Sequence, residues 1–501
     1  MSRTTSDEET PSAIRPWPAL WTLVLGFFMV LMVTTIVQVA TPNIMASLNA
    51  DLNAVIWVTS AYLIAFAVPL LVTGRLGDRF GPKNVYLAGL IVFTAASAWC
   101  GASSTIETLI VARVFQGIGG ALITPQTMAV ITHVFPPQRR GAAMGIWGAA
   151  GGVASLVGPI LGGLIVDTLG WQWTFFINVP LGAIALLLTL RLVPKLPTHR
   201  HRFDVLGVLL SATGVLLLVF GIQQGERYRW GTITGPITVW TLIIAGALLI
   251  GIFIAWQAVN KSEPLVPLAL FRDRNFSLAN LVIAAMGLAV TALSLPLVYY
   301  FQLARGLTPT QSALMLAPMG VLLGVLAPLI GKIGHRVAPR LLVPVSFAAL
   351  AASLLWYVGI LSADVGLGWL LLPSALLGAA NAGIWGPVTT AATRNLPPHR
   401  AGAGAGVYNT TRQLGAVLGS ACIATVMENR LSANLPMSAG ASNLKVLPEP
   451  LHAGFTTAMA QSLLLPAIAS VLAGVLACFF LTPKHSQSTT DAVSTKVSAR
   501  R

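Results

Sequence analysis

Fourteen stretches of this sequence are each long and apolar enough to cross a lipid bilayer as a helix. A helix needs roughly 20 residues to span the ~30 Å hydrocarbon layer. The polar–apolar alternation of a membrane β-barrel is absent, so backbone groups at membrane depth must be hydrogen-bonded within helices. We therefore predict an all-α integral membrane protein with 14 transmembrane helices. The spans are expected near residues 18–41, 54–73, 85–102, 106–131, 142–165, 173–193, 205–222, 235–256, 276–300, 312–331, 340–361, 366–393, 402–426 and 456–481.

The basic residues are distributed unevenly between the two ends of these spans. With fourteen spans both termini lie on one side of the membrane. That side, which includes the even-numbered loops, holds 23 of the 30 Lys and Arg residues, whereas the odd-numbered loops hold five. Because basic loops stay in the cytoplasm, we expect a multi-pass protein of the cell membrane with both termini cytoplasmic. The same asymmetry accounts for the net charge of +15 without a nucleic-acid partner.

The sequence lacks the residue clusters that catalysis, metal binding or ATP hydrolysis would need. The acidic residues are scattered singly, and Cys100, Cys422 and Cys478 lie in separate predicted spans. Paired acids or a metal cluster would be expected of a membrane enzyme. A pump driven by ATP would need a phosphate-binding loop with the spacing Gly-x-x-x-x-Gly-Lys-Ser/Thr, which does not occur. We therefore expect neither an enzyme nor an ATP-driven pump, and no cofactor or metal.

A ten-residue motif occurs twice. The first copy, "GRLGDRFGPK" at 74–83, follows the second span, and "GKIGHRVAPR" at 331–340 begins 257 residues later, after the tenth. If spans seven and eight are an inserted pair, each copy follows the second span of a six-span bundle. Two parallel repeats around a site near the membrane midplane are the architecture of many transporters.

This interpretation divides the chain into seven segments. They are a cytoplasmic tail (1–17), an N-terminal six-helix bundle (18–193), a cytoplasmic loop (194–204), the inserted helix pair (205–256), a second cytoplasmic loop (257–275), a C-terminal six-helix bundle (276–482) and a cytoplasmic tail (483–501). The C-terminal bundle includes an unusually long external segment, 428–455, which gives no clear strand signal.

Six motifs occur in a fixed order along these spans. They are "WVTSAYLIAFA" (57–67), "GRLGDRFGPK" (74–83), "RVFQGIGGA" (113–121), "GPILGG" (158–163), "WTFFINVPLG" (173–182) and "RQLG" (412–415). With them, residues 18–482 resemble the major facilitator superfamily, and the inserted pair is similar to its fourteen-span drug–proton antiporter group of the QacA and EmrB type. The resemblance implies secondary active export of lipophilic drugs or toxic metabolites, by proton antiport and alternating access. It also implies a protein that works as a monomer in the bilayer.

Two basic residues and one loop are the expected coupling and gating elements. Arg113 lies inside a long apolar span, where a charge usually faces the bundle interior or a watery cavity. The alternative is a side chain that snorkels to the outer surface. The resemblance implies a coupling role for Arg113 and a latch role for the 74–83 loop, where Asp78 can face a helix N-terminus. A plain positive-inside loop is the alternative. The residues expected on this basis are Gly74, Arg75, Gly77, Asp78, Arg79, Gly81, Lys83, Arg113 and Arg412.

The fifth span is rich in small residues that allow close backbone contact between helices. The resemblance identifies it as the antiporter motif, a pivot and seal between the halves, and tight packing without a coupling role is the alternative. The residues concerned are Gly148, Gly152, Gly158, Pro159 and Gly162.

The family lines its cargo cavity with spans one, four, nine and twelve of this arrangement. Polar or aromatic residues on these spans are the expected cavity residues, although membrane aromatics are often interface anchors. They are Gln38, Gln116, Gln126, Tyr299, Tyr300, Gln302, Asn381 and Trp385.

One position departs from the family pattern. Family members typically carry an aspartate in span one, whereas the aligned stretch "MVTTIVQVATP" (32–42) has Val33 there. None of the fifteen acidic residues lies deep in a predicted span. Neutral, zwitterionic or anionic cargo should therefore be preferred over cations, and Asp78 and Glu107 are the first candidates to carry protons. The alternatives are a dedicated lipid or secondary-metabolite exporter with altered or absent proton coupling, and a membrane sensor or scaffold that does not transport.

Overall fold

The structure, a computed structural model of the chain, describes residues 16–196, 198, 204–225, 228–260, 264–333, 339–362, 364–393, 401–435 and 449–481. Several predicted segments lie outside these residues. They are most of both cytoplasmic tails, residues 199–203 of the first cytoplasmic loop, residues 334–338 of the second motif copy and residues 436–448 of the external segment.

The N-terminal half is built from long helices that coincide with the first six predicted spans. They are α1 (Pro16–Ser47), α2 (Leu52–Phe80), α3 (Pro82–Gly101), α4 (Ile106–Val134), α5 (Pro137–Leu169), and the sixth span divided into α6 (Trp173–Phe176) and α7 (Asn178–Leu192).

The inserted pair and the C-terminal half follow. The pair is α8 (Val205–Gln223) and α9 (Val239–Val259), joined through the short antiparallel strands β1 (Thr232–Thr234) and β2 (Ile237–Thr238). The C-terminal half contains η1 (Leu268–Arg272), α10 (Arg274–Tyr299), the π-helical turn η2 (Tyr300–Ala304), α11 (Pro309–Ile333), α12 (Pro339–Ile360), α13 (Leu367–Thr393), α14 (Ala401–Asn434), η4 (Glu449–Leu451), α15 (His452–Ser462) and α16 (Leu464–Ala477).

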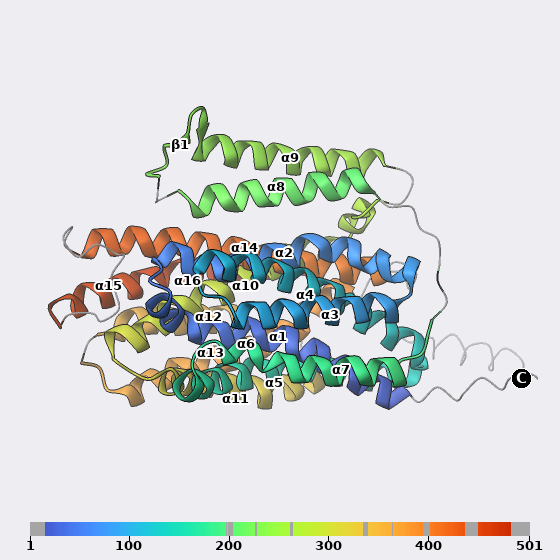
Figure 1. Cartoon of the computed structure of the whole chain (residues 1–501), viewed down its shortest axis with the longest axis horizontal. Coiled ribbons are helices and arrows are strands. Elements are labelled where there is room, and N and C mark those ends of the chain that lie inside the picture. The colour runs from blue at the N-terminus through green and yellow to red at the C-terminus, as the bar shows by residue number, and fades with distance from the viewer. Residues whose placement is uncertain are drawn as a thin grey trace, which may run out of the picture.

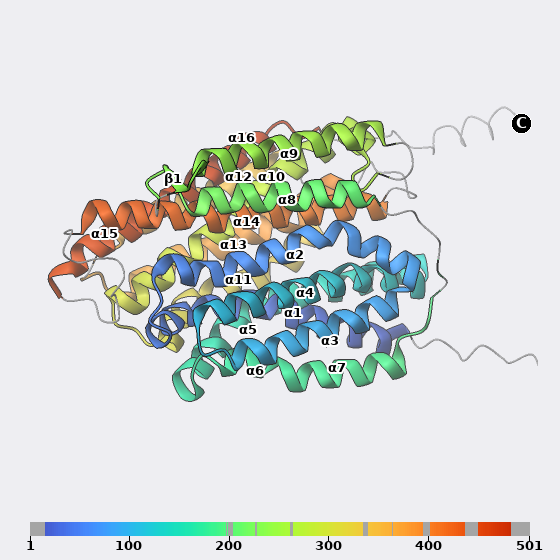
Figure 2. The ribbon, with the colours of Figure 1, turned by 45° about the horizontal axis from the view of Figure 1, so that its top comes forward.

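The helices run roughly parallel or antiparallel in one bundle, with the inserted pair outside it (Figure 1). Helices α8 and α9 pack against each other, and α8 also contacts α2 and α14 (Figure 2). The Asn53 amide donates a hydrogen bond to the Gln223 carbonyl at 3.2 Å, and Thr425 donates one to the Ile222 carbonyl at 2.9 Å. The structure thus confirms an all-α fold in which two helical halves are joined through an added helix pair.

Twelve helices in the described part of the chain are long and apolar enough to cross a membrane. Helices α5 and α14, at 33 and 34 residues, lie where the fifth and thirteenth spans are expected but are richer in small and polar residues. They are not in that count. Fourteen spans therefore stay a prediction.

Several helices begin at a side chain that caps their free N–H groups. Asp51 accepts from the Ala54 amide at 2.7 Å, Asp204 from the Gly207 amide at 2.9 Å and Asp273 from the Phe276 amide at 2.7 Å. An aspartate at this position satisfies one orphan donor and complements the helix dipole. The positions of these acids at the ends of spans, and not within them, thus have a structural cause.

The "GRLGDRFGPK" stretch is more helical than predicted. Helix α2 continues through Phe80, so the expected loop is reduced to a turn at Gly81. The backbone of Gly81 has φ of +88°, which L side chains rarely adopt, and α3 starts at Pro82 directly afterwards. Glycine permits this left-handed conformation, and proline is well suited to the first turn of a helix.

Candidate functional site

Helix α4 is the element that carries Arg113, and two glycines bring it close to its neighbours. A Cβ atom at Gly117 would come within 2.9 Å of Ala65 Cβ in α2, and one at Gly119 would come within 2.7 Å of Phe93 Cα in α3. The "RVFQGIGGA" motif therefore places α4 tightly between α2 and α3. As a result Arg113 is 1% exposed.

The guanidinium of Arg113 is held by two hydrogen bonds. Its Nε donates to the Val58 carbonyl of α2 at 3.0 Å, and its Nη1 donates to Gln116 Oε1 at 2.6 Å. The Gln116 Nε2 donates in turn to Ser97 Oγ in α3 at 3.0 Å, and Ser97 also accepts from Asn178 Nδ2 at 3.1 Å. The expectation that Arg113 faces the bundle interior is confirmed.

Aromatic rings complete the surroundings of this cation. The guanidinium carbon lies 4.1 Å from the ring centre of Tyr62 and 5.9 Å from that of Phe175. A cation over a ring face is attracted by the ring quadrupole, by about 0.5–2 kcal/mol. Among the residues that the structure describes, Arg113 has no carboxylate partner. Its charge is thus stabilised by dipoles and rings. Tyr62, Ser97 and Asn178 were not among the predicted site residues.

Gln126 was expected in the cargo cavity, and the structure places it elsewhere. It is fully buried, and its Nε2 donates to the Thr73 carbonyl of α2 at 2.6 Å. A Cβ atom at Gly77 would overlap the Gln126 amide. Gly77 of the 74–83 motif therefore makes room for a polar contact inside the N-terminal half. Gln116 is likewise fully buried beside Arg113, so neither glutamine lines an open cavity here.

For the other residues of the 74–83 motif, the structure describes the side chains of Arg79 and Lys83. The Lys83 ammonium donates to the Leu190 carbonyl near the end of α7 at 2.9 Å, and the Arg79 guanidinium lies 5.4 Å from the Phe80 ring. Gly74 has open space beside it. The side chains of Arg75 and Asp78 are outside what the structure describes.

Helix α5 lies between the halves, in contact with α1 and α11. Gly158 packs against Thr35 and Gly162 against Ile36, both in α1. Gly163, which the sequence analysis did not single out, faces α11: a Cβ atom there would be 2.6 Å from Thr310 Cα. The close packing expected of the fifth span is therefore present at these positions. Pro159 lies within the continuous helix, and the surroundings of Gly148 and Gly152 are not described.

Four hydrogen bonds between described residues join the N-terminal half to the C-terminal half. They are Ser60 Oγ to Ser420 Oγ (2.7 Å), Gln302 Nε2 to the Val39 carbonyl (3.0 Å), Tyr299 OH to Met45 Sδ (3.9 Å) and the Thr310 amide to Asp167 Oδ2 (3.0 Å). All four lie toward the end of the bundle that carries the turn between α1 and α2, which we call the α1–α2 end. The opposite end, at Gly81, is the α2–α3 end.

The expected cavity residues on the ninth span thus have structural partners. Tyr299 and Gln302 contact α1 across the two halves, and Tyr300 OH donates to the Ser362 carbonyl at 2.7 Å. Both tyrosines are at most 1% exposed. They pack between helices at the α1–α2 end and do not line an open cavity. Gln38 of α1 is half-buried.

A second basic cluster lies in the C-terminal half. Arg412 of α14 lies 5.7 Å from the ring centre of Trp385 in α13, and Trp385 donates from Nε1 to Asn381 Oδ1 at 3.3 Å. Tyr408, one turn before Arg412, is bonded to Thr389 at 3.1 Å. Arg412 has no ion pair within the described residues, and its Nε has no hydrogen-bond acceptor there. Each half thus holds one arginine beside an aromatic ring, and Arg113 is buried whereas Arg412 is half-buried.

The structure also describes Val33 and several of the acidic residues. Val33 is fully buried in the apolar core of the N-terminal half, in the same cluster as Tyr62. Glu107 is exposed in the first turn of α4. Glu428 was expected outside the thirteenth span, but α14 extends past it to Asn434 and its side chain is half-buried. The helix is therefore longer than the predicted span, because its last turns are too polar to be recognised by apolar length.

The sequence matches a family model described as the Major Facilitator Superfamily over residues 23–420. An uncharacterized MFS-type transporter of Mycobacterium tuberculosis is 49% identical over 474 residues, which cover 93% of this chain and 81% of the relative. The tetracenomycin C resistance and export protein of Streptomyces glaucescens is 34% identical over 86% of this chain and 79% of its own length.

More distant similarities extend these matches. The multidrug export protein EmrB of Escherichia coli is 32% identical over 82% of this chain and 80% of its own length. Among solved structures, a D-xylose–proton symporter superimposes with a TM-score of 0.64 over 94% of this chain and 99% of the symporter, at 15% identity. At that identity the likeness concerns the fold alone.

Proposed function

Because the chain belongs to the Major Facilitator Superfamily, we propose that it is a secondary active exporter that moves lipophilic small molecules out of the cell by alternating access. It is a transport protein of the cell membrane and not an enzyme. Relatives that cover most of the chain are named as exporters of an antibiotic and of multiple drugs. The orientation with both termini cytoplasmic, and function as a monomer, are parts of this proposal.

The observation that carries the proposal is the arrangement of contacts between the halves. The four cross-half hydrogen bonds of the described chain lie toward the α1–α2 end. With cytoplasmic termini that end is external, so this conformation is closed to the outside. Export by alternating access requires these contacts to break while contacts form at the α2–α3 end. The glycines of α5 and the 74–83 motif are proposed to serve as the pivot and the latch of that exchange.

The two arginines within the predicted spans set the proposed cargo class. Arg113 is buried and Arg412 is half-buried, and neither is paired with a carboxylate in the described structure. A permanent cation brought near an uncompensated base in a low-dielectric site is repelled. Neutral, zwitterionic and anionic lipophiles are therefore the proposed cargo.

Proton coupling is proposed to use a carboxylate near a helix end. Asp78 and Glu107 remain candidates, and Glu428 joins them because it is half-buried within α14. The alternative is an exporter of one lipid or secondary metabolite with altered or absent coupling, which is favoured by Val33 at the position of the family's aspartate.

A cysteine pair tests alternating access directly. The Ser60 and Ser420 hydroxyls are 2.7 Å apart across the halves, so cysteines at both positions should form a disulfide in this conformation. Oxidation should stop transport and reduction should restore it, while each single-cysteine variant should transport under both conditions. Transport that continues at an unchanged rate with the disulfide fully formed would contradict the proposal, because the halves would then not need to separate.

A further inference from the structure

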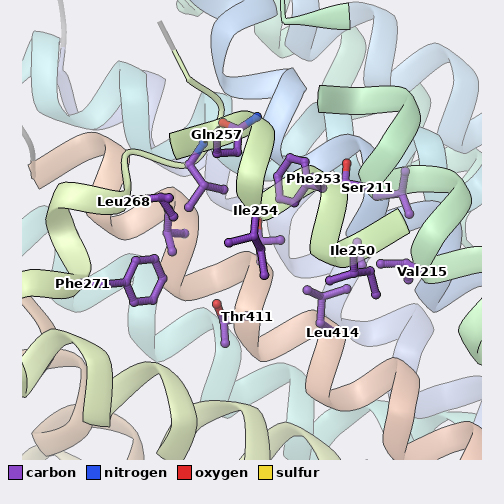
Figure 3. A pocket seen from close by; sticks show the side chains of 15 residues that line it. Ser211, Val215, Ile250, Phe253, Ile254, Gln257, Leu268, Phe271, Thr411 and Leu414 are labelled. Atoms are coloured by element: carbon purple, nitrogen blue, oxygen red, sulfur yellow. Dashed lines mark hydrogen bonds between the residues drawn. The ribbon is translucent and has the colours of Figure 1, made fainter. Parts of the chain in front are cut away.

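A pocket of about 390 Å³ lies between the inserted helix pair and the core (Figure 3). Its walls come from α2 and α14 on one side and from α8, α9 and the segment before α10 on the other. Ala67 belongs to the N-terminal half, Val407 to the C-terminal half and Ile250 to the inserted pair. The volume falls within the range of about 300–1,000 Å³ that small-molecule sites occupy.

The lining of this pocket excludes charged ligands. Eleven of its fifteen lining residues are apolar, and none is Asp, Glu, Lys, Arg or His. An ionised group placed there would lose its hydration without gaining a partner of opposite charge. The pocket therefore suits a neutral and mostly apolar molecule.

Two of the four polar lining residues already have partners. Gln257 donates from Nε2 to Asp204 at 2.6 Å and accepts from the Val266 amide at 3.1 Å, while Ser211 donates to the Val208 carbonyl at 3.1 Å. Gln257 thus ties α9 to the start of α8 and to the segment before α10, and this fixes one end of the pocket. These bonds occupy the O–H of Ser211 and one N–H of Gln257.

Thr410 is different. It is 5% exposed, and its hydroxyl has no hydrogen-bond partner among the residues that the structure describes. Threonines in helices usually bond to a carbonyl three or four residues back, as Thr425 in the same helix does to the Ala421 carbonyl at 3.2 Å. A buried hydroxyl without a partner is unfavourable. Thr410 lines the apolar pocket, but its hydroxyl oxygen is itself buried in this conformation, so a change of side-chain rotamer would turn it toward a ligand with a hydrogen-bonding group.

The pocket is accessible from the side of the protein. Ile254 is 51% exposed and Phe271 is 38% exposed, and both line it (Figure 3). Helix α9 is one of the helices that can span the membrane, so an exposed apolar side chain on it faces lipid. A molecule dissolved in the bilayer can reach the pocket without passing through the aqueous phase.

We propose that this pocket binds one neutral lipophilic molecule of drug size, which arrives from the bilayer and forms a hydrogen bond with Thr410. Such a ligand contacts both halves and the inserted pair at once, so its binding couples the pair to the seam between α2 and α14. An acyl chain of a membrane lipid would fill the apolar walls but would leave the Thr410 hydroxyl unpaired. The ligand class matches the proposed cargo, but binding here does not depend on transport.

Photolabelling of the purified full chain in lipid nanodiscs tests this site. The probes are a diazirine-bearing alkylphenol, which is neutral, and the matched alkylbenzene without its hydroxyl. The phenol should label peptides containing residues 250–257 and 407–414. Val215→Trp fills the pocket and should abolish this labelling. Leu216→Trp is the control, because Leu216 is 46% exposed on the same helix and does not line the pocket.

Thr410→Val separates the hydrogen bond from the shape of the pocket. It should weaken binding of the phenol by about two- to tenfold and leave the alkylbenzene unchanged, with thermal unfolding confirming that the variants are folded. Equal effects on both probes, or a lysolipid that competes as well as the phenol, would mean that a lipid chain occupies the pocket and would overturn the proposal. Labelling that Val215→Trp leaves unchanged in a folded protein would also overturn it. Loss of transport with intact labelling would count against the proposed function alone.

Discussion

Replacing Arg113 by lysine and by methionine tests how its buried charge is stabilised. The native guanidinium reaches two acceptors in different directions, the Val58 carbonyl at 3.0 Å and Gln116 Oε1 at 2.6 Å, and it lies 4.1 Å from the Tyr62 ring centre. A lysine ammonium is a compact, strongly hydrated point charge without the planar fork of arginine. It should keep at most one of the two hydrogen bonds and little of the ring contact.

The energies of these contacts predict that the lysine variant is less stable than the methionine variant. A hydrogen bond to a charged group contributes about 1.5–3 kcal/mol and the ring contact about 0.5–2 kcal/mol. Arg113→Lys should therefore lose about 2–5 kcal/mol, while the cost of burying a charge remains. Arg113→Met removes that burial cost, which is several kcal/mol. It should lose only about 1–3 kcal/mol, mainly because Gln116 Oε1 then keeps only the weak donor of the Cys100 thiol at 3.8 Å.

Thermal unfolding of the purified protein in detergent measures this order. We expect the unfolding temperature to fall from wild type to Arg113→Met and further to Arg113→Lys, although lysine is the conservative change. Both variants should also lose transport of anionic lipophiles more than transport of neutral ones. A lysine variant as stable as wild type would refute the argument, because the paired geometry of the guanidinium would then not be needed.

Three further predictions follow from particular contacts. Gly163→Val should push α5 away from α11 and raise the accessibility of cysteines introduced at the α1–α2 end. Gly151→Ala is the control, because its Cβ would meet its nearest neighbour at an ordinary 3.6 Å. Equal accessibility in both variants would contradict this prediction. Burial raises the pKa of Asp204, but hydrogen bonds from Trp256, Gln257, the Gly207 amide and Asn260 outweigh it and hold that pKa below its ordinary value. The stabilising effect of the Asp204 carboxylate is therefore present above the pKa of an unfolded aspartate and is lost as the pH falls through the lowered folded pKa. The destabilisation by Asp204→Asn should accordingly shrink in acid. A difference in unfolding temperature between the two proteins that is independent of pH would contradict this prediction. Asp78→Asn should keep the fold but weaken the state closed at the α2–α3 end by about 0.3–1 kcal/mol, and an unchanged conformational balance in distance measurements between spin labels would argue against the latch.

The helical architecture could be predicted from the sequence because the length of each apolar stretch decides whether it can span a membrane as a helix. Each predicted span coincides with helix in the described chain, and the twofold motif at 74–83 and 331–340 identified the pair between the halves as an insertion. Apolar length failed at α14, whose second half contains Glu428 and other polar residues. In that region the helix continues because it packs against other helices, which hydropathy does not record.

The candidate site could be predicted only where a residue is costly to bury. Arg113 stands out because a charge in an apolar span needs an explanation, and its burial was confirmed. Gln126 is neutral, so the sequence does not indicate toward which helix its side chain points. Its contact with Gly77 depends on how closely α2 and α4 approach each other. Tyr62 and Ser97 were missed for the same reason, since aromatic and hydroxyl residues are common in membrane helices and only the three-dimensional packing brings them to Arg113.

Transport by the purified protein in liposomes, with and without an imposed pH gradient, tests the central claim most directly. The claim is that the chain is a secondary exporter in which Arg113 and Arg412 exclude permanent cations. We predict movement of a neutral lipophile and of a lipophilic anion, faster with the gradient than after its collapse, and little movement of a lipophilic dication. Strong gradient-driven transport of the dication, or no transport of any of the three cargoes under either condition, would contradict the account.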